Sequence, residues 1–205
     1  MKVIRYTTIA YVFCLFSSTS IAETVFQKRT NFSAKSLTLT EMARSLSRAQ
    51  SYGIAVCSED FLGADVFTIS VTNETLDVVM SNLTTVVTNC VWAYDDKLSI
   101  INIFPKRNSL LNWSIDKIDV KGLSFEHIIM QDDYLKLRQH GITFFPGRGN
   151  LEWLKTPITV KAEGLTAKEA LNMICKQLPF KARWELQHRV NKNKTTGELS
   201  IRGCY

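Results

Sequence analysis

One structural phrase occurs twice in this chain, and the repetition constrains the fold more than any other feature. Each copy is an alternating strand-like run, a polar turn and an amphipathic helix, at residues 67–83 and 158–174. In both helices the apolar residues follow the spacing i, i+3, i+4, i+7, i+11, which places them on one stripe. The apolar positions, offset by 91 residues throughout, are Leu76, Val79, Met80, Leu83 and Val87, and Ala167, Ala170, Leu171, Ile174 and Leu178.

The agreement continues on both sides of these helices. Thr75 and Thr166 stand at the helix starts, where a hydroxyl can accept an unpaired backbone N–H of the first turn. Upstream, each copy has another helical segment that ends at a glycine, Gly53 or Gly141, followed by a strand. Two strands follow the second helix of each copy, and one strand precedes the first helix. The order β-α-β-β-α-β-β, written twice, predicts an α+β protein of two tandem small domains, each a small sheet packed against two helices.

The second copy is the less regular one. Asp132 and Asp133 fall on the expected inner stripe of its first helix, so we expect that helix to break there. The segment FPGRGNLEWLKTP at residues 145–157 lengthens the loop that follows the next strand.

The sequence divides into four segments. Residues 1–22 have a positive start, the short apolar run IAYVFCLF and small residues up to Ala22, which is typical of a secretory signal peptide cleaved after Ala22. That run is far shorter than the ~20 apolar residues of a spanning helix, so no membrane span is expected. Residues 23–105 form the first predicted domain, residues 106–112 a linker, and residues 113–205 the second domain. We expect a periplasmic or secreted protein.

Four cysteines remain beyond the predicted signal peptide: Cys57, Cys90, Cys175 and Cys204. An even number in an exported chain favours two disulfides over the alternative, four buried thiols. Four cysteines permit three pairings. The simplest one stays within each repeat, Cys57 with Cys90 and Cys175 with Cys204, and each bridge would stabilise the fold by ~3 to 4 kcal/mol.

The repeated order of elements resembles a known family. The segments YGIAV, TISVTNETLDVVMSNL, CVWAY and LSIINI resemble the short N-terminal domain of secretins and TonB-dependent transducers. HGITF, ITVKAEGLTAKEALNMI, ARWEL and LSIRG resemble a second copy of it. Such domains are non-catalytic modules for protein interaction and assembly in the periplasm of Gram-negative bacteria. The resemblance covers nearly all of residues 23–205 and implies a tandem pair of such modules.

Charge is divided unequally between the two predicted domains. Residues 23–105 hold six Lys/Arg and nine Asp/Glu, whereas residues 106–205 hold 17 Lys/Arg and ten Asp/Glu. We expect the basic half to contact an envelope protein with an acidic face. The alternatives are an anionic lipid or polysaccharide, a plain solvated surface, or contact with the acidic half itself. The candidate partner-binding residues are Arg148, Lys181, Arg183, Arg189, Lys192 and Lys194.

The basic hairpin near the C-terminus does not favour nucleic acid as a partner. Arg183 and Glu185 alternate with Trp184 along a predicted strand, so the charges share one face and the tryptophan lies on the other. We therefore expect Trp184 in the core. Stacking of bases would need aromatic side chains on the same face as the charges.

Motifs for catalysis or metal binding are missing from the sequence. The histidines, His127, His140 and His188, lie outside H-E-x-x-H and outside metal-ligand spacing. The loop PGRGN lacks the helix that follows a phosphate-binding loop, and G-x-S-x-G is absent. We expect no catalytic site, no metal and no cofactor.

The sequence thus predicts an exported, non-catalytic interaction or assembly module of the bacterial cell envelope. Exposed sheet edges would offer main-chain pairing to an envelope protein, or to a second copy of the chain. One alternative is a secreted effector or toxin-associated subunit, which would share the signal peptide and the disulfides. Another is an envelope enzyme with a site in the interdomain cleft, near His127 and Arg148.

Overall fold

The computed structural model describes residues 29–49, 54–61, 66–131, 133–146, 151–191 and 194–204. The first half contains β1 (Arg29–Leu37), α1 (Leu39–Ala49), β2 (Ala55–Phe61), β3 (Phe67–Thr75), α2 (Leu76–Val86), β4 (Cys90–Asp95) and β5 (Ile100–Pro105). The second half contains β6 (Ser114–Ser124), the π-helical turn η2 (His127–Gln131), β7 (Ile142–Phe145), the 3-10 turn η3 (Glu152–Lys155), β8 (Pro157–Thr166), α3 (Ala167–Cys175), β9 (Ala182–Asn191) and β10 (Lys194–Gly203). The predicted α+β class is confirmed. The predicted signal peptide lies outside the described residues.

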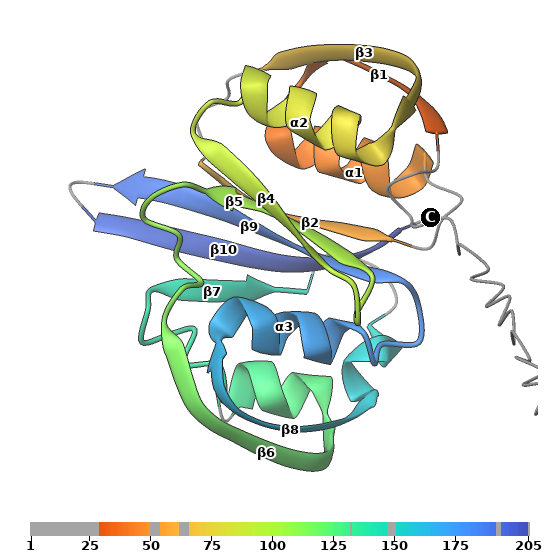
Figure 1. Ribbon diagram of the computed structural model, residues 1–205. Coiled ribbons are helices and arrows are strands. Elements are labelled where there is room, and N and C mark those ends of the chain that lie inside the picture. Colours follow the sequence, from red (N-terminus) through yellow and green to blue (C-terminus); the bar gives the residue numbers. More distant parts are fainter. Residues whose placement is uncertain are drawn as a thin grey trace, which may run out of the picture.

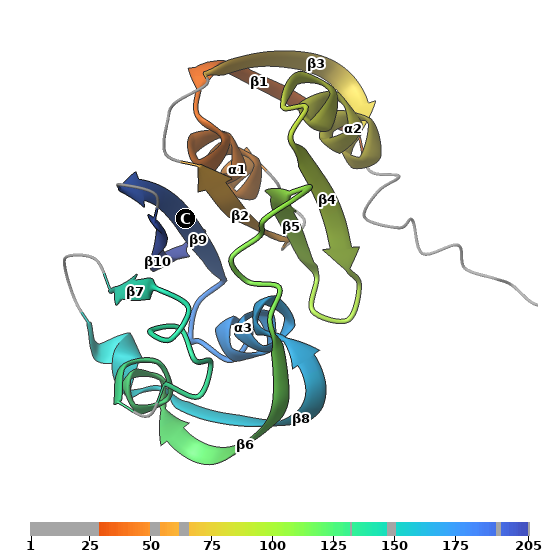
Figure 2. The same ribbon diagram turned by 90° about the vertical axis from the view of Figure 1, so that its left-hand side faces the viewer.

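The layers are arranged about one central sheet of six strands, in the order β4-β5-β2-β9-β10-β7 (Figure 1). Helices α1 and α2 cover one face of this sheet, and the antiparallel ribbon β1-β3 lies outside them. Helix α3 and η2 cover the other face, with the antiparallel ribbon β6-β8 beyond them; the view from the side shows the same order (Figure 2).

The central sheet contains strands from both halves, so the predicted arrangement of two domains with separate sheets is not confirmed. Strand β2 pairs with β5 through Ala55–Ser58 and, on its other side, with β9 through Ser58–Phe61. A strand at a sheet edge presents unpaired N–H and C=O groups, and here each half supplies the partner that the other half lacks.

Two cores lie on opposite faces of this sheet. Alternate residues of β2 enter different cores: Val56 packs with α1 and α2, whereas Cys57 packs with α3. This alternation is that of a strand covered on both faces. The predicted helical stripes are confirmed as core residues, and apart from the half-buried Val87 all are buried: Leu76, Val79, Met80, Leu83, Ala167, Ala170, Leu171, Ile174 and Leu178.

Each of the four ribbon strands ends in the same way. A residue with positive φ is followed two positions later by a Ser or Thr whose hydroxyl accepts a hydrogen bond from the backbone N–H three residues further on. The pairs are Ser36 and Thr38, Asn73 and Thr75, Gly122 and Ser124, and Gly164 and Thr166. The left-handed residue turns the strand, and the hydroxyl satisfies an N–H of the helical turn that follows.

The first helix of the second half is short, as the two acidic residues predicted. It is reduced to η2, and Asp133 then takes a positive φ of 49°. The Asp133 carboxylate accepts hydrogen bonds from the N–H groups of Leu137 (2.6 Å) and Arg138 (3.0 Å). Turns, not a helix, lead from there to Gly141, whose φ of 72° brings the chain into β7.

Candidate functional site

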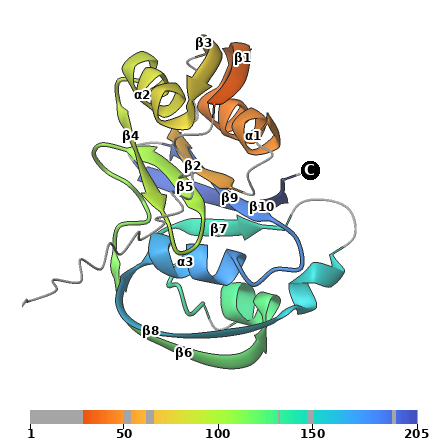
Figure 3. The same ribbon diagram turned by 45° about the vertical axis from the view of Figure 1, so that its right-hand side comes forward.

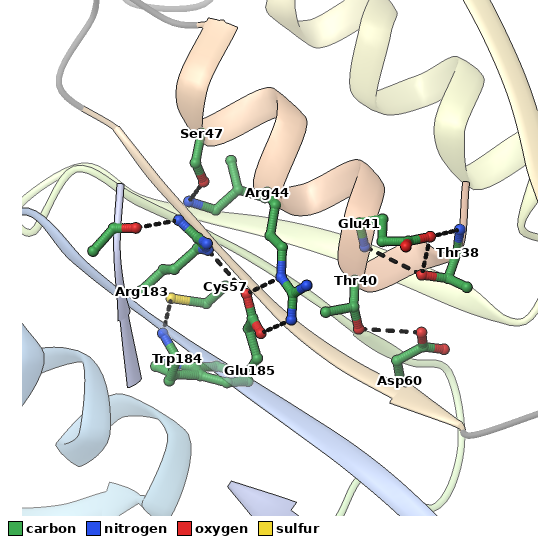
Figure 4. Close-up of polar contacts among 12 residues, drawn as sticks. Thr38, Thr40, Glu41, Arg44, Ser47, Cys57, Asp60, Arg183, Trp184 and Glu185 are labelled. Atoms are coloured by element: carbon green, nitrogen blue, oxygen red, sulfur yellow. Dashed lines mark hydrogen bonds and ion pairs between the residues drawn. The ribbon is translucent and has the colours of Figure 1, made fainter. Parts of the chain in front are cut away.

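The contact between the halves is the most elaborate polar site in the described part of the chain. Strands β2 and β9 run parallel, with Ser58 opposite Glu185 and Phe61 opposite His188. We call this contact the β2–β9 junction. A close-up shows it beneath α1 (Figure 4), and a second side view shows β2 beside β9 (Figure 3).

A buried carboxylate at the junction binds two arginines from different halves. Arg44 on α1 approaches Glu185 on β9 with both ends of its guanidinium, Nε at 2.8 Å and Nη2 at 2.6 Å. Arg183, two residues before Glu185, donates from Nε to the same carboxylate at 3.0 Å and from Nη1 to the carbonyl oxygen of Gly203 at 2.8 Å. Bidentate pairing of this kind is strong and directional.

The electrostatics of Glu185 follow from this geometry. Burial alone would raise the pKa of the Glu185 carboxyl, but the hydrogen bonds and charge of Arg44, together with Arg183, outweigh burial and lower it. The pKa of Arg44 is raised by its hydrogen bond to Glu185. The Glu185 carboxylate is therefore ionised at neutral pH, and it fixes the position of α1 over β9.

A second buried carboxylate joins the same two strands to the connection between the halves. Glu59 on β2 lies 2.7 Å from Nε2 of His188 on β9, and it accepts a hydrogen bond from the Ser109 hydroxyl at 2.5 Å. The backbone N–H of Leu110 also donates to Glu59. Since Leu111 is fully buried as well, the part of the predicted linker from Ser109 to Leu111 packs into the junction, whereas residues 106–108 are exposed.

These polar residues were missed by the sequence interpretation. From the sequence, His188 is only a histidine outside metal-ligand spacing, and Glu59 has no expected role. The one available signal is a carboxylate two residues after the apolar run of β2, which is an unusual position unless a partner is buried with it.

The predicted partner-binding residues that the structure describes differ in their exposure. Arg183 is 2% exposed and is removed from the candidate contact surface, because α1 covers the face of β9 that carries it. Lys181 is half-buried, and burial lowers its pKa. Arg189 is exposed but pairs with Glu198 at 2.5 Å.

The other three predicted partner-binding residues lie wholly or partly outside the described residues. Arg148 and Lys192 lie outside the described residues, as does the side chain of Lys194. Trp184, on the opposite face of β9, is fully buried, as predicted, and its Nε1 donates to the Asn172 side chain at 2.7 Å.

The four cysteines are free thiols in the structure. Cys57 and Cys90 belong to the two different cores, on opposite faces of the central sheet, which disfavours the predicted bridge between them. Burial raises the pKa of Cys57, which accepts a hydrogen bond from the Trp184 N–H at 3.4 Å. Cys175 and Cys204 lie close enough to influence each other electrostatically. Pairing of these two stays a prediction.

A cavity of about 570 Å³ opens where the halves meet, between the β4–β5 hairpin and the start of β9. Its wall is mostly apolar, with Lys176 and Lys181 as the charged side chains, and His127 is not part of it. Within the described ranges, no three His, Cys, Asp or Glu side chains gather in a way that could hold a metal ion.

The central sheet has two edge strands, β4 on one side and β7 on the other. Ala93 is exposed on β4, and Thr143 and Phe145 are exposed on β7, with Phe145 46% accessible. These two edges are the candidate interaction site, because an unpaired edge can add a strand from another chain.

Similarity to known proteins does not identify a role for the candidate site. No helix among the described residues is long and apolar enough to cross a membrane. No family model matches the chain, and no curated protein or solved structure is significantly similar to it.

Proposed function

We propose that this chain is an exported, non-catalytic protein-interaction and assembly module of a bacterial cell envelope, built from two units of the kind found at the N-terminus of secretins and TonB-dependent transducers. The units are residues 23–105 and 113–205, and the predicted signal peptide directs the chain to the periplasm.

The order of elements supports two related units. Each half has the order strand, helical segment, strand, strand, helix, strand, strand when the short turn η3 is set aside. Each ribbon strand ends at a left-handed residue two positions before a capping hydroxyl. A duplicated unit accounts for both repetitions.

The observation that carries the proposal is the β2–β9 junction. One half holds the other by strand pairing, and an ion pair between the half-exposed Arg44 on the helix beside β2 and the buried Glu185 fixes the contact. The chain thus already uses strand addition as its mode of association, and β4 and β7 offer it again at the two ends of the sheet. Main-chain hydrogen bonds supply affinity in this mode, and side chains beside the edge supply selectivity.

In-cell photo-crosslinking from the edges would test the proposal. A photoreactive residue is placed at Ala93 on β4 or at Thr143 on β7, and, as a matched control, at the exposed Ser70 on β3. We expect the chain in the periplasmic fraction, with discrete protein adducts from both edges and none from Ser70. Adducts that are equal at all three positions, or absent from both edges, would contradict the interaction module. Accumulation in the culture medium would favour the secreted effector.

A further inference from the structure

The central sheet is built from two triplets of strands with the same pattern. In β4-β5-β2 the outer strand β4 is antiparallel to β5, and β5 is parallel to β2. In β9-β10-β7 the strand β9 is antiparallel to β10, and β10 is parallel to β7. The two triplets correspond strand by strand, β4 to β9, β5 to β10 and β2 to β7. The junction therefore pairs the last strand of the first triplet, β2, with the first strand of the second, β9. The two strands left at the edges, β4 and β7, are likewise a first strand and a last strand.

We propose that copies of this chain associate head to tail, with β7 of one copy pairing in parallel with β4 of the next, so that each contact repeats the form of the β2–β9 junction and extends the sheet. The inference deepens the proposed function, on which it rests, by naming a second copy of the chain as the occupant of the open edges.

The directions of the strands allow this arrangement with every copy of the chain in the same orientation. Strands β5, β2 and β9 point one way, whereas β4, β10 and β7 point the other way. Since β4 and β7 point in the same direction, a second copy in the same orientation brings its β4 beside β7 in parallel, as β2 lies beside β9. The covering helices also change face at the junction, from α1 and α2 to α3, and they would change back at the contact between copies.

The contact joins surfaces of opposite charge. Strand β4 belongs to the half with six Lys/Arg and nine Asp/Glu, and β7 to the half with 17 and ten. At the edges themselves, β4 ends at Asp95, with Asp96 in the following turn, whereas Arg138 lies beside β7. At the junction, Arg44 from the segment before β2 binds Glu185 on β9. Arg138 lies in the segment before β7, and its guanidinium donates to the Met130 carbonyl oxygen. In a parallel contact Asp95 lies toward the Phe145 end of β7, so the charge difference acts between the two halves as a whole.

The edge of β7 also has room for a neighbour's side chains. Thr143 and Arg138 line a cavity of about 260 Å³ beside the strand, with apolar side chains such as Met130 and Phe144 around it. Phe145, 46% exposed, extends the apolar surface past the cavity. By contrast, the ribbon strands β1 and β6 carry register shifts and left-handed residues, which blunt an edge against pairing.

Blocking one edge strand at a time tests whether β7 of one copy pairs with β4 of the next. Lysine at Ala93 places a like charge against the basic β7 edge, and lysine at Thr143 blocks β7 itself. At about 100 μM we expect the wild-type chain to form oligomers beyond the dimer in analytical ultracentrifugation, and each lysine variant to remain a monomer. An equimolar mixture of A93K and T143K has one intact β7 and one intact β4, so it should give a dimer and nothing larger.

Charge reversal at the same position is the matched control. Ala93 follows Trp92 on β4 as Glu185 follows Trp184 on β9, and both tryptophans lie opposite an isoleucine of the next strand. We therefore expect A93E to associate at least as tightly as the wild type, and A93K to raise the dissociation constant tenfold or more, since like charges in contact are strongly unfavourable. S70K on β3 should leave association unchanged.

Three results would overturn the inference: a monomeric wild-type chain, a dimer formed by A93K or T143K alone, or equal weakening by A93E and A93K. If a lysine variant unfolds at a lower temperature than the wild type, chemical cross-linking takes its place in the test. A mixture of A93C and T143C is treated with a short bis-maleimide, and we expect covalently linked dimers. The control mixture of A93C and S70C should give none. A monomer in solution together with edge adducts to another protein in cells would reject self-assembly and leave the proposed function standing.

Discussion

Replacing Glu185 by glutamine should destabilise the whole molecule, because its carboxylate binds Arg44 across the junction and Arg183 on its own strand. Arg183 is 2% exposed and keeps its charge after the change. Removing one partner of a buried ion pair costs ~3 to 5 kcal/mol, and because the glutamine oxygen can still accept from Arg183 we expect the low end, about 3 kcal/mol. With a urea slope of about 2 kcal/mol per molar, the unfolding midpoint should fall by about 1.5 M.

Urea titration of reduced protein, followed by tryptophan fluorescence, measures this loss, and two variants check its origin. Arg44 is 34% exposed, so R44Q should cost only about 1 kcal/mol. The double change R183M/E185L removes both buried charges and should recover most of the loss in E185Q. A loss below about 1 kcal/mol in E185Q, or an equal loss in R44Q, would refute the assignment of Glu185 as a buried charge that Arg183 requires.

The same variant has a defined pH dependence. The folded-state pKa of Glu185 is lowered, because the arginines outweigh burial. The stability that its ionised form supplies is therefore complete above the unfolded value of about 4.3 and disappears as the pH falls through the lower folded value. The difference in unfolding free energy between the wild type and E185Q should be constant near neutral pH and should shrink on acidification. A difference that grows below pH 4 would contradict the sign of the shift.

Three further changes have expected outcomes. G197A on β10 places a Cβ 2.7 Å from Leu186 Cδ1, and we expect thermal unfolding to show a loss of about 1 to 3 kcal/mol. T166A removes the capping box of α3 and should cost about 1 kcal/mol by urea unfolding, whereas T166S should retain most of it. Mild oxidation followed by peptide mapping should yield a bridge between Cys175 and Cys204, and recovery of both as thiols would contradict it.

The local structure could be predicted from the sequence because its causes are local. Apolar spacing located the buried stripes of α2 and α3, and the threonines marked where those helices begin. Adjacent acidic residues on an inner stripe indicated that the first helix of the second half would break, and the helical turn does end at Gln131, with Asp133 in the left-handed conformation. Each of these depends on contacts within a few residues.

The joining of the two halves could not be predicted in the same way. Alternation along β9 correctly assigned Arg183 and Trp184 to opposite faces, but it cannot tell a face open to water from one covered by a distant helix. The helix that covers Arg183 is α1, from the other half of the chain. For the same reason Cys57 was paired within its own half, although its side chain enters the core of the other one.

The packing of β2 also limits how the gene for this chain can be shortened or recombined during evolution. Ala55 and Cys57 are buried beneath α3, and Glu59 meets His188 together with Ser109 from the connecting segment. A truncated gene encoding residues 1–105 alone would leave an apolar strip and a carboxylate bare to water. We therefore expect the two halves to be lost or recombined only as a joined pair.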